Sequence, residues 1–305
     1  MIYTVTLNPS IDYVVHLDRL VSGVTNRTTG EEYYFGGKGI NVSHILAELD
    51  LDSTALGFVA GFTGEAIEKG TKHPRITTDF IHLREGVSRI NVKIKSDEET
   101  EINGQGPHID DEALAAFMDK TDGIRDGDTL ILSGSIPKTM PDDVYERILE
   151  RVKDRDVRLV VDATKKLLLN SLKYRPFLIK PNRQEISEMF GVEVRDEETT
   201  LLYAGKLQEM GARNVLVSLG GDGAMLLDEF GCVHKAGVAK GTVLNTVGSG
   251  DSMVAGFVAG CIEKGDYAYA LRLGSACGNA TAFMDGLATR EKIDELMKYF
   301  GSNIN

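Results

Sequence analysis

Residues 244–257 join a tight glycine turn to the start of a helix, and the types of these residues suit chemistry on an anion. Gly248 and Gly250 flank Ser249, and helix-compatible residues then begin at about Asp251. The free N–H groups and the dipole at the start of such a helix attract an anion. The carboxylate of Asp251, at the start of this helix, therefore has two interpretations. It caps the helix of an ordinary glycine turn, or it is a base held beside a bound phosphate.

Residues 36–41 (GGKGIN) form a second glycine-rich helix start. The glycines again expose backbone N–H groups, and Lys38 adds a positive charge among them. Asn41, in the first turn, can reach the same pocket. These residues predict a second anion site, and the alternative is a glycine-rich joint with an exposed lysine.

Polar residues also stand where predicted strands end. From residue 110 onward strands and helices alternate, and Ser135, Asp162 and Asn182 each follow or end a strand-like run. This alternation predicts a mainly parallel sheet with helices on both faces. Ligands bind beyond the carboxyl ends of the strands in such sheets, so we expect these residues at a ligand site.

Two stretches, 12–35 and 87–103, have strand character without a helical period. Together they predict a small β-sheet, interpreted as a lid beside the main domain. Residues 88–95 alternate apolar and polar side chains, as a half-exposed strand does. Arg89 therefore either projects from the lid and binds a phosphate, or is an unpaired surface arginine.

Two turn-rich segments are ambiguous. Residues 219–223 (LGGDG) follow a predicted strand and suit either the close approach of a nucleotide or a hairpin connection. Residues 69–78 (KGTKHPRITT) are predicted to form a loop. By contrast, the helices expected at 251–262 and 270–283 carry small residues about four apart, which predicts close packing that holds the glycine turn rigidly.

Taken together, these polar residues fit phosphoryl transfer. One anion hole would hold the moving phosphoryl group, a base would accept a hydroxyl proton, and cations would hold a second phosphate. Asn182 with Glu185 would position a hydrated Mg²⁺. Competing chemistries lack their motifs, because the chain has no GxxxxGK[ST], GxSxG or HExxH sequence and no GxGxxG in its first strand–helix unit.

The composition predicts a globular protein. Its 305 residues are 42% hydrophobic and 26% charged, and no linker or repeat divides them, so we expect one domain over 1–305. The net charge of −12 repels nucleic acid and anionic lipid, so we expect neither as a partner. The chain begins with a strand-like run and shows no signal or anchor, which favours a cytoplasmic protein. Cys232, Cys261 and Cys277 are expected to be reduced core residues.

Seven motifs resemble, in order, those of one family. They are TLNPSID (6–12), GGKGIN (36–41), RINVK (89–93), LSGSIP (132–137), KPNRQE (180–185), VSLGGDG (217–223) and NTVGSGD (245–251). By these motifs the chain is identified as a member of the ribokinase-like (PfkB) carbohydrate kinases, within the branch that acts on hexose phosphates. The resemblance implies a three-layer α/β/α sandwich with a mainly parallel sheet and a small β lid. It also implies a homodimer that forms through this lid.

The resemblance further implies roles for the matched residues. Asp251 would be the base that deprotonates the sugar hydroxyl, and the hole for the transferred group would be formed by Gly248, Ser249 and Gly250. The sugar hydroxyls would be bound by Asp12, Gly37 and Asn41, and the phosphate already on the sugar by Lys38, Arg89 and Ser135. The ATP site would be lined by Lys180, Asn182, Ser218, Gly220, Gly221, Gly223 and Gly250. Mg²⁺ and its waters would be ordered by Asn182 and Glu185.

The implied reaction is the ATP-dependent phosphorylation of D-fructose 1-phosphate at its 6-hydroxyl. The alternative within the class is tagatose 6-phosphate, phosphorylated at its 1-hydroxyl, because ketohexose phosphates are nearly symmetric from end to end. Relatives that act on fructose 6-phosphate carry an additional arginine near the position of Glu101, and its absence here argues against that substrate. A third hypothesis is a sugar-phosphate sensor without turnover. Such a protein should have lost the base or the Mg²⁺ ligands, but Asp251, Asn182 and Glu185 are all present.

Overall fold

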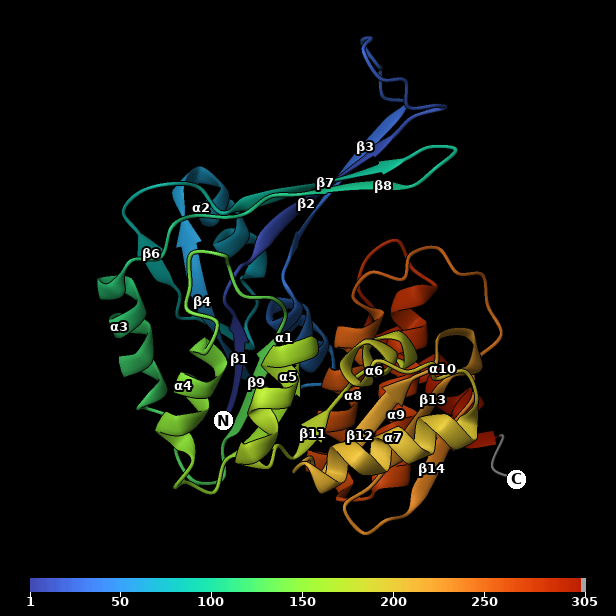
Figure 1. Cartoon of the computed structure of the whole chain (residues 1–305). Helices are drawn as coiled ribbons and strands as arrows, with labels where there is room; N and C mark the ends of the chain where they lie inside the picture. Colours follow the sequence, from blue (N-terminus) through green and yellow to red (C-terminus); the bar gives the residue numbers. More distant parts are fainter. Residues whose placement is uncertain (303–305) are drawn as a thin grey trace.

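The computed structural model describes residues 1–302, which fold around one large β-sheet (Figure 1). Its strands are β1 (Ile2–Thr6), β4 (Ser53–Ala60), β5 (Ile76–Thr78), β6 (Ile81–Leu83), β9 (Thr129–Ser133), β10 (Arg158–Asp162), β11 (Leu178–Ile179), β12 (Asn214–Ser218), β13 (Ala224–Leu227) and β14 (Val233–Ala236). Their order is β14-β13-β12-β11-β10-β9-β1-β4-β5, and β6 pairs with β4. The pairs β12–β13 and β13–β14 are antiparallel, and the other pairs among these strands are parallel. The predicted mainly parallel sheet is confirmed.

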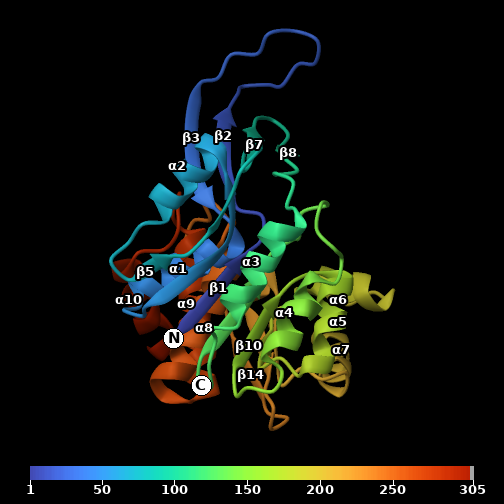
Figure 2. The same cartoon turned by 90° about the vertical axis from the view of Figure 1, so that its left-hand side faces the viewer.

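Helices cover both faces of this sheet and complete three layers (Figure 2). One face packs against α3 (Asp111–Thr121), α4 (Val144–Val152), α5 (Lys165–Ser171), α6 (Arg183–Phe190) and α7 (Glu197–Glu209). The other face packs against α1 (Lys38–Glu48), α8 (Ser249–Lys264), α9 (Tyr267–Ala282) and α10 (Arg290–Ser302). A smaller apolar cluster joins α2 (Gly61–Thr71) to α1 and β4. Two short 3₁₀ turns, Leu172–Tyr174 and Gly220–Asp222, follow α5 and β12. The predicted three-layer sandwich is confirmed.

A second sheet of four strands stands away from the large one, at the top of Figure 1. It contains β2 (Ser10–His16), β3 (Gly30–Gly36), β7 (Arg89–Lys95) and β8 (Thr100–Asn103), in the order β3-β2-β7-β8. The pairing of β2 with β7 sets Ser10 opposite Arg89 and Asp12 opposite Asn91. Since alternate residues of a strand share a face, these four side chains lie on one face of the four-stranded sheet. We call this sheet the lid.

The close contact between α8 and α9 depends on glycine, as the sequence predicts. A Cβ on Gly256 would lie 2.7 Å from the Cys277 Sγ, and one on Gly260 would lie 2.6 Å from the Ala270 Cα. A Cβ on Gly274 would lie 2.7 Å from the Met253 carbonyl oxygen. The two backbones therefore touch, and α9 fixes the position of the helix that follows the glycine turn.

The loop predicted at 69–78 is wrong at both of its ends. α2 continues to Thr71, whose hydroxyl donates a hydrogen bond to the Ile67 carbonyl oxygen (2.9 Å). At the other end β5 pairs in parallel with β4, so that Ile76 stands opposite Ser53. A three-residue edge strand shows too little alternation to be seen in the sequence, and here the pairing with β4 decides its conformation.

Three further features differ from, or add to, the predictions. No helix is predicted after residue 283, yet α10 buries Ile293, Leu296 and Phe300 against the core at helical spacing. No strand is predicted at β6 either. Cys261 and Cys277 are buried free thiols as expected, but Cys232 is exposed, because it lies in the turn before β14.

Candidate active site

The helix α8 starts two residues earlier than the sequence predicts. It begins at Ser249, and Gly248 is the N-cap residue in the left-handed region (φ 81°). Asp251 therefore lies in the first turn, and the interpretation of Asp251 as the N-cap is wrong. The first backbone N–H groups of a helix have no acceptor within it, and the positive end of the helix dipole lies beside them. The turn is thus built to hold an anion.

Asp251 is a buried carboxylate with one amide partner. The residue is 5% exposed, and the Asn41 side chain donates a hydrogen bond from Nδ2 to its Oδ2 (2.8 Å). Burial, and then the negative charge of Asp162, raise the pKa of Asp251 to about 6. Lys38, Asn41 and Lys180 oppose this rise. A carboxylate with such a pKa is a base at neutral pH and still accepts a proton readily.

A second buried carboxylate, Asp162, joins two lysines next to this base. The Lys38 Nζ lies 3.0 Å from the Asp162 Oδ2, and the Lys180 Nζ lies 3.5 Å from the Asp162 Oδ1. Burial disfavours the charge on Asp162, but the two lysines outweigh it and hold the pKa of Asp162 below its ordinary value. For Lys38 the charges of Asp162 and Asp251 likewise outweigh burial and raise the pKa. The cluster therefore contains two fixed cations.

A cavity of about 210 Å³ opens beside Lys38. Its walls combine the residues predicted to hold a phosphate with neighbours from two strand ends: Gly37, Lys38, Arg89, Ser133, Ser135 and Asp162. The Arg89 side chain reaches in from the lid, where its Nε donates to the Asn8 carbonyl oxygen (3.0 Å). Two cations in one polar cavity suit a bound phosphate.

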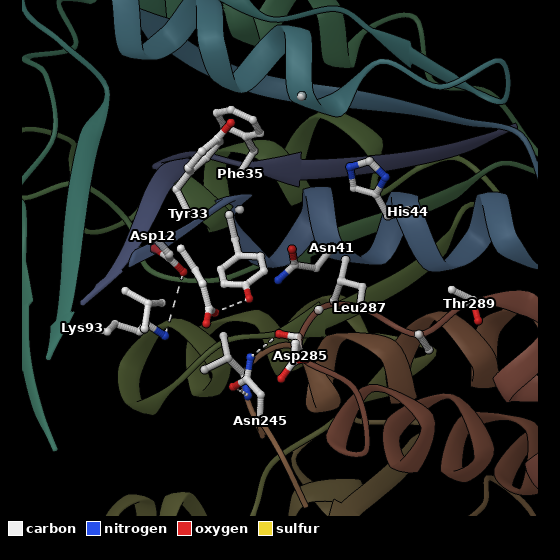
Figure 3. A pocket seen from close by; sticks show the side chains of 18 of the residues that line it. Asp12, Tyr33, Phe35, Asn41, His44, Lys93, Asn245, Asp285, Leu287 and Thr289 are labelled. Carbon is white, nitrogen blue, oxygen red and sulfur yellow. Dashed lines mark hydrogen bonds and ion pairs between the residues drawn. The ribbon is translucent and has the colours of Figure 1, made fainter. Parts of the chain in front are cut away.

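A larger cavity of about 360 Å³ lies under the lid and is lined by Asp12, Asn41 and Lys93 (Figure 3). Asp12 is held there by the lid itself. Its Oδ1 accepts hydrogen bonds from the Ser10 hydroxyl (2.9 Å) and from the Asn91 Nδ2 (2.8 Å), and the Lys93 Nζ lies 3.9 Å from its Oδ2. The cavity continues past Asn41 to the loop that contains Asp285. Its carboxylate and amides suit a ligand rich in hydroxyl groups.

Several residues of the candidate site carry a buried polar atom without a hydrogen-bond partner. In residues 1–300, the buried side-chain atoms without a hydrogen-bond partner are Asn8 Oδ1, Asn91 Oδ1, Ser133 Oγ, Ser249 Oγ and Ser275 Oγ. Asn8 and Ser133 line the smaller cavity, Asn91 holds Asp12, and Ser249 begins α8. Since buried polar groups normally have partners, this concentration points to a polar ligand that this part of the fold is built to receive.

The glycine turn predicted to receive a nucleotide is also a hairpin connection. β12 and β13 are antiparallel, with Ser218 opposite Ala224, so the hairpin interpretation of residues 219–223 is confirmed and the nucleotide interpretation stays a prediction. Gly223 has a φ of 95°, and a Cβ there would lie 2.1 Å from the Ala236 carbonyl oxygen. Gly220, with a φ of 59°, and Gly221 are exposed and have open space beside them, which leaves the backbone accessible to a ligand.

Asn182 and Glu185, the predicted metal residues, form the N-terminal capping box of α6. The Asn182 N–H donates to the Glu185 Oε2, and the Glu185 N–H donates to the Asn182 Oδ1 (2.8 Å each). This gives both residues a structural role. Among residues 1–302 no three His, Cys, Asp or Glu side chains gather to hold a metal ion directly. One carboxylate and one amide fit a Mg²⁺ ion that keeps most of its waters and binds phosphate oxygens.

The structure thus gathers most, but not all, of the predicted residues. Lys38, Arg89, Gly37 and Ser135 surround one cavity, and Asp12 and Asn41 line the other. Ser218 is linked to Asn182 by a β-bridge, away from both cavities, and Lys180 lies beside Gly250.

The contacts of Asp162, Asn91 and Lys93 were missed. Asp162 was noted in the sequence only as a strand end, and Asn91 and Lys93 only within a motif. Strand alternation puts Arg89, Asn91 and Lys93 on one face, but that Asp12 shares this face follows only from the observed pairing of β2 with β7.

A family model described as pfkB family carbohydrate kinase matches residues 5–292. The chain is 46% identical to a 1-phosphofructokinase of Bacillus subtilis, over 97% of each chain. It is 42% identical to a D-tagatose-1-phosphate kinase of Bacillus licheniformis, again over 97% of each chain. Among solved structures, phosphofructokinase-2 from Escherichia coli in complex with substrates and products has a TM-score of 0.91 and 25% identity, covering 98% of this chain and 99% of that one.

These matches agree with the observed fold. No helix in residues 1–302 is long and apolar enough to cross a membrane. The three-layer fold with its small second sheet is the ribokinase-like one. The family match spans nearly the whole chain, and two curated relatives exceed 40% identity. The chain therefore belongs to the pfkB family of carbohydrate kinases.

Proposed function

We propose that the protein transfers a phosphoryl group from ATP to the 6-hydroxyl of D-fructose 1-phosphate, giving fructose 1,6-bisphosphate and ADP. One observation carries this proposal. A buried base at an anion-binding helix start lies next to a separate cavity that contains two cations, Lys38 and Arg89. An acceptor that already carries a phosphate needs such a second anion site, whereas an unphosphorylated sugar does not. The name of the Bacillus subtilis relative supports the same acceptor.

The residues have distinct tasks in this reaction. Asp251 accepts the proton of the acceptor hydroxyl as the oxygen attacks the terminal phosphorus of ATP. The amides of Gly248, Ser249 and Gly250 bind the oxygens of the group in transfer, where negative charge is concentrated. Asp12 and Asn41 bind sugar hydroxyls, and Gly37 closes the turn beside them. The phosphate that does not react is held by Lys38, Arg89 and Ser135.

The nucleotide would bind over the exposed turn at Gly220 and Gly221, between Ser218 and the start of α8. Lys180 lies beside Gly250 and would neutralise the phosphate chain there. Asn182 and Glu185 would hold the waters of a Mg²⁺ ion, as their donor set allows. That ion supplies charge neutralisation to the phosphates of ATP when it is bound.

A second candidate substrate is D-tagatose 1-phosphate, because a relative of that name is 42% identical to this chain. Like fructose 1-phosphate, D-tagatose 1-phosphate carries a phosphate at one end and a free 6-hydroxyl at the other. Tagatose 6-phosphate, the other alternative, would occupy the same site with the two ends of the sugar exchanged. A coupled ADP-release assay that compares kcat/KM for all three sugar phosphates, with fructose 6-phosphate as a fourth, tests the proposal. A higher kcat/KM for any sugar phosphate other than fructose 1-phosphate would contradict it, and no ADP release with any of them would support a sensor.

The raised pKa of Asp251 predicts how activity depends on pH. A base must be deprotonated to work, and a pKa of about 6 means that Asp251 is mostly protonated below that pH. We therefore expect kcat to rise with pH through about 6 and to level off above 7. A pH profile at saturating substrates and constant ionic strength measures this. A profile that stays flat from pH 5 to pH 8 would show that no group with this pKa limits turnover.

The lid also supports a homodimer, which we include in the proposal. Its face opposite Asp12 carries Tyr33, Ile90 and Ile102, which are 64%, 41% and 59% exposed. An exposed apolar sheet face of this kind is typical of a surface that another chain covers. Light scattering should give twice the chain mass, and Ile102→Glu should shift it towards the monomer. A wild-type protein that is monomeric at micromolar concentration contradicts this part of the proposal.

A further inference from the structure

Asp162 is a buried carboxylate at the end of β10, and its contacts are unusual because both of its oxygens face lysines. The residue is 2% exposed. Its Oδ2 lies 3.0 Å from the Lys38 Nζ, and its Oδ1 lies 3.5 Å from the Lys180 Nζ. Lys38 comes from the first turn of α1 and Lys180 from the end of β11, so nothing in the local sequence pairs them. One carboxylate thus connects two cations from separate elements.

The two lysines lie at different parts of the site. Lys38 lines the cavity of about 210 Å³ together with Arg89 and Ser135. Lys180 is enclosed, with 8% of its side chain exposed, and its Nζ lies 3.0 Å from where a Cβ on Gly250 would be. The first place is the proposed site for the phosphate on the sugar, and the second is the start of α8, where the transferred group would lie.

We propose that Asp162 is a positioning residue that holds Lys38 and Lys180 between these two phosphate positions. The proposal rests on the proposed function. An ammonium group has three N–H donors, so a lysine bonded to Asp162 keeps donors for an anion. Without the carboxylate the two like charges would repel each other, and Lys180, whose side chain is 8% exposed, would lose hydration without gaining a partner. Asp162 itself acts through the lysines.

The charge of Asp162 has a second effect, on the base. The charged groups that act on Asp251 are Asp162 from β10, Lys38 from α1 and Lys180 after β11. Asp162 is the one that raises the pKa of Asp251, and the two lysines lower it. Removing the charge of Asp162 should therefore lower the pKa of the base, whereas moving its carboxylate should not.

Two variants separate position from charge. Asp162→Asn keeps the size but removes the charge and turns an N–H₂ group towards one lysine. Asp162→Glu keeps the charge but moves the carboxylate by one methylene. We expect kcat to fall about tenfold in both, because misplaced charges stabilise the transition state less well. We expect the acid limb of the kcat–pH profile to move to lower pH in Asp162→Asn and to stay in place in Asp162→Glu. A kcat within twofold of wild type in both variants, with an unmoved acid limb in Asp162→Asn, would overturn the proposal.

The matched control is Asp228→Asn. Asp228 lies in the turn between β13 and β14 and is also buried, at 3% exposed. Its Oδ2 pairs with the Nε2 of His234, which is in β14 (2.8 Å). We expect this variant to lose stability but to keep kcat and the acid limb, so it reports the effect of losing any buried aspartate. An acid limb that moves equally in Asp228→Asn and Asp162→Asn would show a general effect and overturn the proposal.

A double-variant cycle keeps the test open if Asp162→Asn alone does not fold. Lys38→Met with Asp162→Asn removes one cation, whose side chain is 38% exposed, together with the buried anion. We expect the two substitutions to lower kcat by less in combination than the product of their separate effects, because they break a shared interaction. If Asp162→Asn does not fold, Asp162→Glu takes its place in the cycle. The kcat values of Asp162→Glu, Lys38→Met and the double variant are then compared in the same way. Effects that multiply fully would overturn the proposal.

The wild-type measurement separates this proposal from the proposed function. It comes first and uses fructose 1-phosphate, D-tagatose 1-phosphate and tagatose 6-phosphate with ATP and Mg²⁺. The absence of turnover with all three contradicts the function before any variant is compared. If one of them is a substrate, that sugar phosphate is used for every Asp162 variant, and the outcome then concerns Asp162 alone.

Discussion

We expect Asp251→Asn to lower kcat by about a hundredfold to ten-thousandfold while sugar phosphate and ATP still bind, as for the loss of a general base. Asparagine has nearly the shape of aspartate, and its Oδ1 can still accept the hydrogen bond that Asn41 donates to Asp251. It cannot accept the proton of the acceptor hydroxyl. The variant also removes a buried charge, so the folded state should not be destabilised. Steady-state kinetics measures the loss, and calorimetry measures binding.

The control for this prediction is again Asp228→Asn, which removes a buried carboxylate remote from the lysines. Its kcat should stay near that of wild type. If Asp251→Asn retains near-normal turnover, another group is the base and the role assigned to Asp251 is wrong. A loss of turnover that is matched by a loss of sugar-phosphate binding would instead assign Asp251 to binding.

Arg89→Ala should raise the KM for the sugar phosphate on the order of tenfold to a hundredfold, since a hydrogen bond to a charged group contributes about 1.5–3 kcal/mol. The KM for ATP should change little. Arg89 lines the cavity that contains Lys38, and its Nε is already held by the Asn8 carbonyl oxygen. Its guanidinium is therefore oriented before a phosphate arrives, and alanine removes both the charge and this orientation.

Arg84→Ala is a suitable control for Arg89→Ala. Arg84 stands five residues earlier, its side chain is 81% exposed, and it pairs with Glu112 on the surface. Both KM values should remain at their wild-type levels in this variant. An equal rise in both KM values for Arg89→Ala would mean that the arginine supports the fold of the lid rather than the acceptor's phosphate.

The sequence predicted the large sheet because strand and helix patterns alternate in it with turn residues between them. Most strands of that sheet are buried apolar runs, and helices of clear period separate them. Two of the elements that were not predicted, β5 and β6, lack such a pattern. β5 and β6 have three residues each, too few to show a period, and they form by pairing with β4. α10 has a helical pattern, but it stands after the last recognised motif.

The glycine turns of the site were located from the sequence, but the contacts between them were not. Asn41 and Asp251 are 210 residues apart in the chain, and Lys38 and Asp162 are 124 apart. Their meeting depends on the strand order β11-β10-β9-β1, which places the ends of separate strands side by side. Residue types and spacing do not specify this order. For this reason Asp162 was recognised as a strand end but not as the partner of both lysines.

The contact between α8 and α9 determines which half of the site is able to move. A methyl group has no room at Gly256, Gly260 or Gly274, so α8 cannot slide along its neighbour without a collision between backbones. The entry of a sugar and the departure of its product must then be accommodated elsewhere. The four-stranded sheet joins the main body through short segments such as residues 7–9, between β1 and β2. If the protein acts as proposed, we expect the lid, and not the start of α8, to change position when the acceptor enters and its product leaves.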